Sequence, residues 1–469
     1  MELDTRALAL LPLVLASLAT FLQPATANDG TPRPGGGFSL RLVPYGGWNS
    51  TMHVGGGGFL HLNEQAATTA LRPHFHGPRG FTYSVATTVG TGHGRHTYDL
   101  VLDTASSLTW MQCVPIAHPF AQIPPPFNPD ISPSFSRVSR KSSLCHGPSP
   151  RQTCEFRATR LDGTHASGVL GNETFAFANN GGAAAAAEVR GVVFGCVHTT
   201  TVFDSHGVLA GVLGLGRMRP SLIWTRLHQH GQDGRFSYCL FGPGRPSRHG
   251  LRFGADIPAT GHMRSTKILY MQYTTSPDFS AYFVSVVGIS VAEKALVRPP
   301  GRRILFKPIN RAGVILWKRQ TRDLFRRHKS PDGRWNGGCL IDPGTGTTAI
   351  IQPVYHVLEH AVEEHVTRLG LPVVKRDGYR LCFSGATQAA FEHLPTVTLR
   401  FEEGAGLVIR PQQLFVFVQR DICLAVVPSK HMTIIGAMQQ VDTRFVYDIA
   451  AAKIHFAPER CSDDTGGQN

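Results

Sequence analysis

One short device occurs twice in this chain and constrains its fold more than any other feature. A strand-like apolar run ends in an aspartate, and a tight turn with hydroxyl residues follows. The copies are Leu100-Val-Leu-Asp-Thr-Ala-Ser106 and Cys339-Leu-Ile-Asp-Pro-Gly-Thr345. A buried carboxylate must be stabilised by N–H groups and hydroxyls, because burial otherwise neutralises it. Asp103 and Asp342 are therefore expected in two similar turns, one in each half of the chain.

Two such turns that face each other would let their carboxylates share one proton. One carboxylate then acts as a base towards water, and the other donates a proton to the carbonyl of the bond to be cleaved. A single Asp-Thr or Asp-Pro-Gly is only a common turn. The repetition of the device in both halves of the chain is what predicts a catalytic pair.

The length and the residue pattern indicate two β-rich lobes. The chain has 469 residues, and a single core stops growing near roughly 250–300 residues. Fifty glycines and 32 prolines favour short strands joined by turns. Apolar alternation begins at Phe81, while helical spacing is convincing mainly from Pro353 to Leu369. We predict an all-β fold with two lobes and a few short helices.

The first 79 residues are expected to be a leader. Residues 1–27 have an apolar stretch followed by a small-residue cleavage site, which is typical of a secretory signal peptide. Their acidic start leaves a short membrane anchor as the alternative. Residues 28–79 are Gly-rich with weak periodicity and are predicted to be a pro-segment. No later segment has 18 uninterrupted apolar residues, so no stable membrane span is expected in the mature chain.

The net charge of +14 is concentrated in one segment. Between Val297 and Arg334 there are 12 Lys or Arg against two Asp, which gives +10. No nucleic-acid module surrounds this segment, so nucleic acid is not expected as a partner. The basic insertion, residues 298–334, is interpreted as a solvated loop, with a docking patch for an acidic partner as the alternative.

The nine cysteines predict disulfides in an oxidising compartment, because they include no C-x-x-C pair that would suggest zinc or redox chemistry. No metal and no cofactor are expected. The odd count leaves one thiol unpaired, and Cys339 is the candidate because it lies three residues before Asp342. Asn49 and Asn172 open N-x-Ser/Thr sequons, which are usable for glycosylation only after secretion.

Separated motifs surround the two aspartate turns. They include Leu108-Thr-Trp-Met-Gln-Cys113, Gly211-Val-Leu-Gly-Leu-Gly-Arg217, Arg235-Phe-Ser-Tyr-Cys-Leu240, Tyr282-Phe-Val-Ser-Val-Val-Gly288 and Thr433-Ile-Ile-Gly-Ala-Met-Gln-Gln440 followed by Tyr447-Asp448. With these motifs the chain resembles the pepsin-like aspartic proteases, specifically their plant nepenthesin-like branch. The resemblance covers nearly all of the chain after the signal. It implies a bilobal fold with a cleft between an N-terminal lobe at 80–268 and a C-terminal lobe at 269–469.

The resemblance also implies roles for individual residues. Asp103 and Asp342 match the catalytic pair, and Ser106 and Thr345 match hydroxyls that bond to the carboxylates. Thr104 matches the residue whose hydroxyl reaches the opposite lobe. Further candidates are the flap residues Arg160, Asp162 and Gly163, the disulfide partners Cys382 with Cys423, and the loop-closing pair Cys145 with Cys154.

Three departures from the family fall inside the candidate site. Ala105 stands where the family has Gly, which keeps the backbone N–H. Pro343 replaces Ser or Thr after the second aspartate and removes a hydroxyl and an N–H from the turn. Arg160 occupies the position of the flap tyrosine, with Leu161 in the place of the family's Gly, and a permanent cation there favours ionised carboxylates.

Two functions follow from these observations. The first is an aspartic endopeptidase that cleaves polypeptides at acidic pH, with activity reduced by Pro343 and Arg160. The second is a catalytically degenerate member of the fold that binds a partner or inhibits a glycosidase. In either case a monomeric, secreted glycoprotein of the plant extracellular or wall space is expected, with the vacuole as the alternative.

Overall fold

The computed structural model describes residues 38–40, 42–45, 82–145, 153–160, 162–177, 187–201, 203–205, 207–229, 234–242, 250–254, 257–269, 281–292, 294–297, 325–326, 328–329 and 335–461. The predicted signal peptide, Asn49, Leu161 and most of the pro-segment and of the basic insertion lie outside these residues. No helix within the described part is long and apolar enough to cross a membrane.

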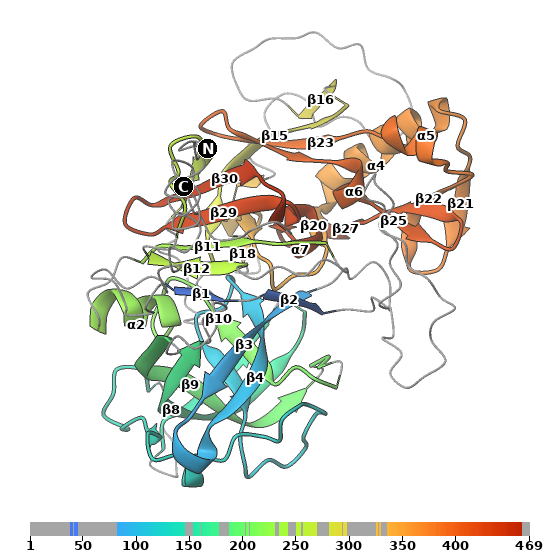
Figure 1. Cartoon of the computed structure of the whole chain (residues 1–469). Coiled ribbons are helices and arrows are strands. Elements are labelled where there is room, and N and C mark those ends of the chain that lie inside the picture. The colour runs from blue at the N-terminus through green and yellow to red at the C-terminus, as the bar shows by residue number, and fades with distance from the viewer. Residues whose placement is uncertain are drawn as a thin grey trace, which may run out of the picture.

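Within the described residues, most strands of the first half belong to one large sheet. In spatial order it contains β2 (Leu42–Tyr45), β3 (Thr82–Val89), β4 (His96–Asp103), β10 (Gly211–Gly214), β5 (Thr109–Gln112), β9 (Ala187–Thr201), β8 (His165–Phe177) and β6 (Ser136–Arg137), and β7 (Glu155–Thr159) pairs with β8. Short helices accompany it: η2 (Gly92–Gly94), η3 (Pro129–Ile131) and α2 (Leu222–Gln229). Figure 1 shows this half in blue and green.

The second half contains smaller sheets. One has the order β14 (Phe283–Val284), β19 (Cys339–Ile341), β28 (Thr433–Ile435), β20 (Thr348–Ile351), β27 (Val426–Ser429). A second sheet has the order β16 (Lys294–Val297), β15 (Val286–Val291), β23 (Val397–Phe401), β24 (Gly406–Ile409). Another has the order β21 (Val373–Arg376), β22 (Tyr379–Ser384), β26 (Asp421–Leu424), β25 (Phe415–Val418). A two-stranded sheet pairs β17 (His328–Lys329) with β18 (Trp335–Asn336). Its helices are α4 (Gln352–Arg368), α5 (Gln388–Glu392), α6 (Pro411–Leu414) and α7 (Ala437–Gln440).

A further sheet is shared by the two halves and joins them. Its order is β1 (Phe38–Leu40), β12 (Leu251–Phe253), β11 (Phe236–Cys239), β29 (Thr443–Asp448), β30 (Lys453–Pro458), β13 (Arg264–Lys267). Strands from the end of the chain therefore pair with strands of the first half, and Figure 1 shows them between the two halves. The predicted boundary near residue 268 falls directly after β13, so this sheet belongs to neither lobe alone.

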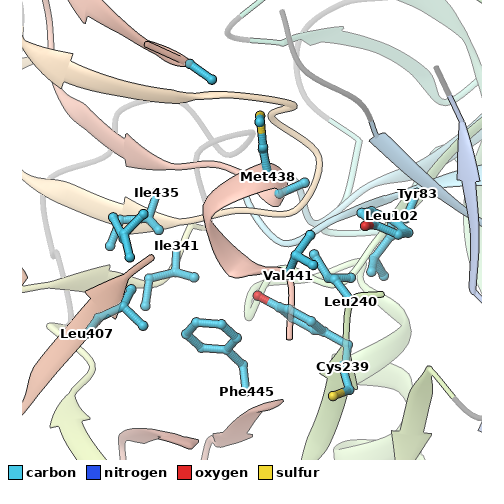
Figure 2. Packing of buried hydrophobic residues seen from close by; sticks show 14 of the residues in the cluster. Tyr83, Leu102, Cys239, Leu240, Ile341, Leu407, Ile435, Met438, Val441 and Phe445 are labelled. Atoms are coloured by element: carbon cyan, nitrogen blue, oxygen red, sulfur yellow. The ribbon is translucent and has the colours of Figure 1, made fainter. Parts of the chain in front are cut away.

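The all-β prediction is confirmed, and the local patterns explain the elements. The alternating segment that begins near Phe81 forms β3, whose Tyr83 and Val85 are fully buried. The predicted helix is α4, which buries Val354, Tyr355, Leu358, Val362 and Val366 on one face. Leu102, Ile341 and Ile435, which lie next to the two aspartate turns, belong to one cluster of buried residues that includes both halves (Figure 2).

The predicted pro-segment contributes to two sheets. Phe38–Leu40 pairs with β12 of the shared sheet, and Leu42–Tyr45 pairs with Thr82–Val85 of the large sheet. These are main-chain pairings at the edge of each sheet. Residues 38–40 and 42–45 of the predicted leader are thus integrated with the body of the fold.

Candidate active site

Equivalent pairs of parallel strands carry the two aspartates. Asp103 is the last residue of β4, which pairs in parallel with β10, and the Asp103 carbonyl accepts from Leu215 N–H at 2.8 Å. Asp342 directly follows β19, which pairs in parallel with β28, and Asp342 N–H donates to the Ile435 carbonyl at 3.0 Å. Both aspartates are 2 % exposed. The apolar runs before each aspartate account for this burial, because both strands lie inside their sheets.

The first turn wraps the Asp103 carboxylate in donors. Oδ1 accepts from the N–H groups of Ala105 and Ser106, both at 2.8 Å. Oδ2 accepts from the Ser106 hydroxyl at 3.1 Å. Ala105 thus keeps the backbone contact that a Gly would make at this position. The turn therefore holds the Asp103 carboxylate in a fixed orientation.

The Asp342 carboxylate draws its donors from both turns. Oδ1 accepts from Gly344 N–H at 3.0 Å and, across the halves, from Thr104 N–H at 3.1 Å. Oδ2 accepts from the Thr345 hydroxyl at 2.8 Å. The Thr104 hydroxyl also donates to the Ile341 carbonyl at 2.9 Å. The first turn therefore reaches into the second, and Asp103 and Asp342 lie in one site.

The second turn contacts the first by packing. A side chain added at Gly344 would place its Cβ 3.0 Å from Cγ of Asp103, a crowded contact that glycine avoids. Pro343 is buried at the same turn but has no N–H or hydroxyl with which to return the contact that Thr104 makes. The turn-to-turn hydrogen bonding is thus asymmetric, in line with the departure seen in the sequence.

The Asp342 carboxyl group has a raised pKa. Burial first, and then the nearby charge of Asp103, raise the pKa of Asp342 to about 6. The Arg160 guanidinium and the donors Gly344 N–H and Thr345 hydroxyl oppose this rise. Below pH 6 the Asp342 carboxyl is therefore neutral and able to donate a proton.

Arg160 of the flap lies directly on the first aspartate. Its Nη1 is 2.5 Å from Asp103 Oδ2, and its Nη2 donates to the Gly344 carbonyl at 3.2 Å. Nε donates to Asp162 Oδ2 at 3.1 Å. The side chain is 11 % exposed. A single guanidinium therefore joins the flap to both aspartate turns, and it occupies one side of the oxygen at which a catalytic water would be activated.

A tight turn between β7 and β8 presents Arg160. Gly163 N–H donates to the Arg160 carbonyl, and Thr164 N–H donates to Asp162 Oδ1 at 2.9 Å. Gly163 has φ +90°, a conformation that glycine adopts without cost. Although partial desolvation tends to raise it, the charge of Arg160 and the Thr164 contacts hold the pKa of the exposed Asp162 side chain below its ordinary value, so Asp162 is a charged anchor for the guanidinium.

Four disulfides stabilise the frame around the site. The structure bonds Cys145 to Cys154 and Cys382 to Cys423, the pairs that the family resemblance suggests, and leaves Cys339 as a buried free thiol. Two further bonds, Cys113–Cys196 and Cys239–Cys461, have no individual signal in the sequence because connectivity depends on the fold. The second of these joins β11 to the end of the described chain.

The remaining site candidates are placed as follows. Asn172 lies half-buried inside β8, between β6 and β9. Glycosylation there stays a prediction. Within the described residues, no group of three or more His, Cys, Asp or Glu side chains could hold a metal ion. The hydroxyl groups next to the two carboxylates belong to Thr104, Ser106 and Thr345.

Comparison with known proteins agrees with this geometry. Family models described as xylanase inhibitor N-terminal and xylanase inhibitor C-terminal match residues 85–255 and 323–458. The crystal structure of edgp superposes with a TM-score of 0.61 at 19 % identity, covering 82 % of this chain and 93 % of that one. Soybean basic 7S globulin gives 0.58 at 17 % identity, covering 81 % and 95 %. These structures share the fold.

Sequence relatives have informative names. Aspartyl protease family protein 2 of Arabidopsis thaliana is 29 % identical over 418 residues, which is 82 % of this chain and 76 % of the relative. Aspartic proteinase nepenthesin-1 of Nepenthes gracilis is 28 % identical over 412 residues, 83 % of each. The paired aspartate turns, the matching family models and these relatives agree: the chain belongs to the pepsin-like aspartic protease family, and it is similar to plant nepenthesins.

Proposed function

We propose that this protein is an aspartic endopeptidase that hydrolyses polypeptides at acidic pH. The observation that carries the proposal is the asymmetric pair in one site. Asp342 has a pKa raised to about 6, so it is a proton donor in acid, while Asp103 accepts three hydrogen bonds from its own turn and is assigned the role of base. An acid and a base of this kind are what peptide hydrolysis requires.

In the proposed reaction each carboxyl group accepts a proton once and donates a proton once. Asp103 takes a proton from a water molecule as the water oxygen attacks the scissile carbonyl carbon, and Asp342 gives its proton to the carbonyl oxygen. The tetrahedral intermediate then loses the amine when its C–N bond breaks. The amine takes the proton held by Asp103, and the diol returns a proton to Asp342. Thr104, Ser106 and Thr345 hold the two carboxylates in place during these steps.

Removal of either carboxyl group tests the proposal. Asp103→Asn and Asp342→Asn each keep the shape of the turn and remove the acid–base group, so cleavage of an unfolded protein between about pH 3 and 5 should fall by a factor of at least about 10³. Pepstatin should block the wild-type protein. Absence of cleavage by the wild-type protein over this pH range would reject the enzymatic function.

A second function is favoured by a specific observation. The Arg160 guanidinium forms an ion pair with Oδ2 of Asp103, and Pro343 lacks the donor that would complete the turn. A cleft neutralised in this way suits a binding protein, and the matching family models are described as xylanase inhibitor. Under this alternative the protein binds a glycosidase or another partner without cleaving it, and a pull-down with a xylanase would detect the complex.

The cellular setting is part of the proposal. The signal-like residues 1–27, the sequon at Asn172 and the disulfides together support a secreted protein of the extracellular or wall space, or a vacuolar one. An expressed fusion to a fluorescent protein would report the compartment.

A further inference from the structure

A cluster of four aromatic side chains borders the two aspartate turns. Phe236 and Tyr238 come from β11, Tyr447 comes from β29, and Tyr282 directly precedes β14. All four are fully buried. The Phe236 and Tyr447 rings stack at a centroid distance of 4.5 Å, and the Tyr282 ring meets Tyr447 edge-on at 4.8 Å. We call Tyr282 and Tyr447 the bridging tyrosines.

Tyr447 is connected to the second turn. Its hydroxyl donates to the Ile341 carbonyl at 3.2 Å, the same carbonyl that accepts from Thr104. Its Oη also lies 3.1 Å from that of Tyr238. Burial raises the pKa of Tyr447 above its ordinary value, while hydrogen bonds from Tyr238 and Thr104 oppose the rise. Tyr447 is therefore a neutral donor adjacent to the residue before Asp342.

The same network returns to Asp342 by a second route. Tyr238 donates to Gln440 Oε1 at 2.6 Å, and the Gln440 amide donates to the Ile435 carbonyl at 2.7 Å. That carbonyl also accepts from Asp342 N–H. The carbonyl and the N–H of the peptide bond between Ile341 and Asp342 are thus both tied to one buried network that includes Tyr447.

Tyr282 connects the second half to the first turn. Its hydroxyl donates to the Leu215 carbonyl at 2.8 Å, and Leu215 N–H donates to the Asp103 carbonyl at 2.8 Å. Leu215 follows β10, the strand that pairs with β4 beside Asp103. A side chain of the second half therefore reaches the backbone support of the first aspartate, which is the direction of contact that Pro343 cannot provide.

We propose that Tyr282 and Tyr447 are positioning residues that hold the two aspartate turns in register across the halves and replace the donor missing at Pro343. The inference rests on the proposed endopeptidase function. Neither tyrosine touches the carboxylates, and each acts through the backbone of a neighbouring strand. Their hydroxyls fix where Asp103 and Asp342 lie relative to each other, so the rate of the chemical step depends on them more than substrate binding does.

Removal of single oxygen atoms tests the proposal. Tyr282→Phe and Tyr447→Phe keep the rings, so each should lower kcat about five- to tenfold, the rate equivalent of one buried hydrogen bond, with KM changed by less than about twofold. Tyr98→Phe is the matched control. Tyr98 is equally buried, and its hydroxyl has no hydrogen-bond partner in the described part of the chain. A loss no larger than that of the control would overturn the proposal.

A restored donor at Pro343 supplies the decisive comparison. In a Pro343→Ser background the kcat loss from Tyr282→Phe should shrink to about twofold, because the serine returns part of the contact. An equal loss in both backgrounds would show that Tyr282 does not substitute for that donor.

The free energy of unfolding in urea gives a second measurement that needs no activity. It is measured for the wild type, Tyr282→Phe, Pro343→Ser and the double variant. If the effects at positions 282 and 343 on the free energy of unfolding are not additive, but none of these proteins cleaves substrate, the endopeptidase function is rejected and the positioning role of Tyr282 is supported. If the wild-type protein cleaves substrate, but the effects at the two positions are additive in both assays, the positioning role of Tyr282 is rejected and the endopeptidase function is supported.

Discussion

At the scale of single residues, Arg160 distinguishes this site from a simple aspartate pair. Its pKa is raised because the attraction of Asp103, Asp162 and Asp342 outweighs the effect of burial, so it stays charged at every pH at which the protein is folded. Resemblance places Arg160 at the flap tyrosine position. The contacts to Asp103 and Gly344 could not be predicted, because they depend on how the flap folds over the turns.

Arg160→Tyr should raise kcat/KM for an unfolded protein substrate about tenfold at pH 4. The change removes the guanidinium that competes with water for Asp103 Oδ2. Arg157→Tyr is the control, because Arg157 is exposed on the same flap strand, β7. A progress-curve assay of both variants measures the effect. Unchanged or lower activity of Arg160→Tyr would mean that the guanidinium does not compete for the oxygen.

The raised pKa of Asp342 predicts a pH dependence of stability. In the unfolded chain an Asp titrates near 4, but in the folded protein it titrates at about 6, so the folded state binds more protons between these values. The free energy of unfolding contributed by Asp342 is therefore full below about pH 4 and decreases as the pH rises to 6, by on the order of 2–3 kcal/mol.

Asp342→Asn should remove this decrease, because an amide does not titrate. Urea unfolding at pH 4, 5, 6 and 7 measures it, with Asp377→Asn on the surface as the control. An identical slope in wild-type and Asp342→Asn proteins would contradict the assignment of the raised pKa to Asp342.

At the scale of elements, the flap hairpin and the paired parallel strands create the site. β4 with β10 and β19 with β28 bring each aspartate to the end of a buried strand, and β7 with β8 carries the arginine to them. Apolar alternation predicts that these segments are strands. Their partners are set by long-range packing, since pairing energy depends on neighbours more than on local propensity.

The N-terminal strands give a prediction at this scale. Deletion of residues 38–45 removes β1 and β2 from the edges of two sheets, so it should lower the free energy of unfolding by about 2–4 kcal/mol. Urea unfolding measures this loss, and deletion of residues 28–35 controls for shortening of the chain. Equal stability of both deletions would indicate that residues 38–45 are a dispensable leader.

At the scale of the whole molecule, the shared sheet makes the two halves interdependent. β29 and β30, from the end of the chain, complete a sheet begun by β11 and β13, and Cys239–Cys461 closes this arrangement across 222 residues. The bridging tyrosines lie in or beside this sheet. The relative position of Asp103 and Asp342 is therefore set by the interface between the halves and by neither half alone.

The sequence by itself determined the fold class and predicted the two aspartate turns. Both aspartates precede hydroxyl-bearing turns at the ends of apolar strands, and short-range patterns of this kind are local properties of the chain. The tertiary structure alone decided which other groups meet: Arg160 with Asp103 and Gly344, and Tyr282 with Leu215. Such contacts join residues tens to hundreds of positions apart, and their geometry is fixed by core packing, which no local pattern encodes.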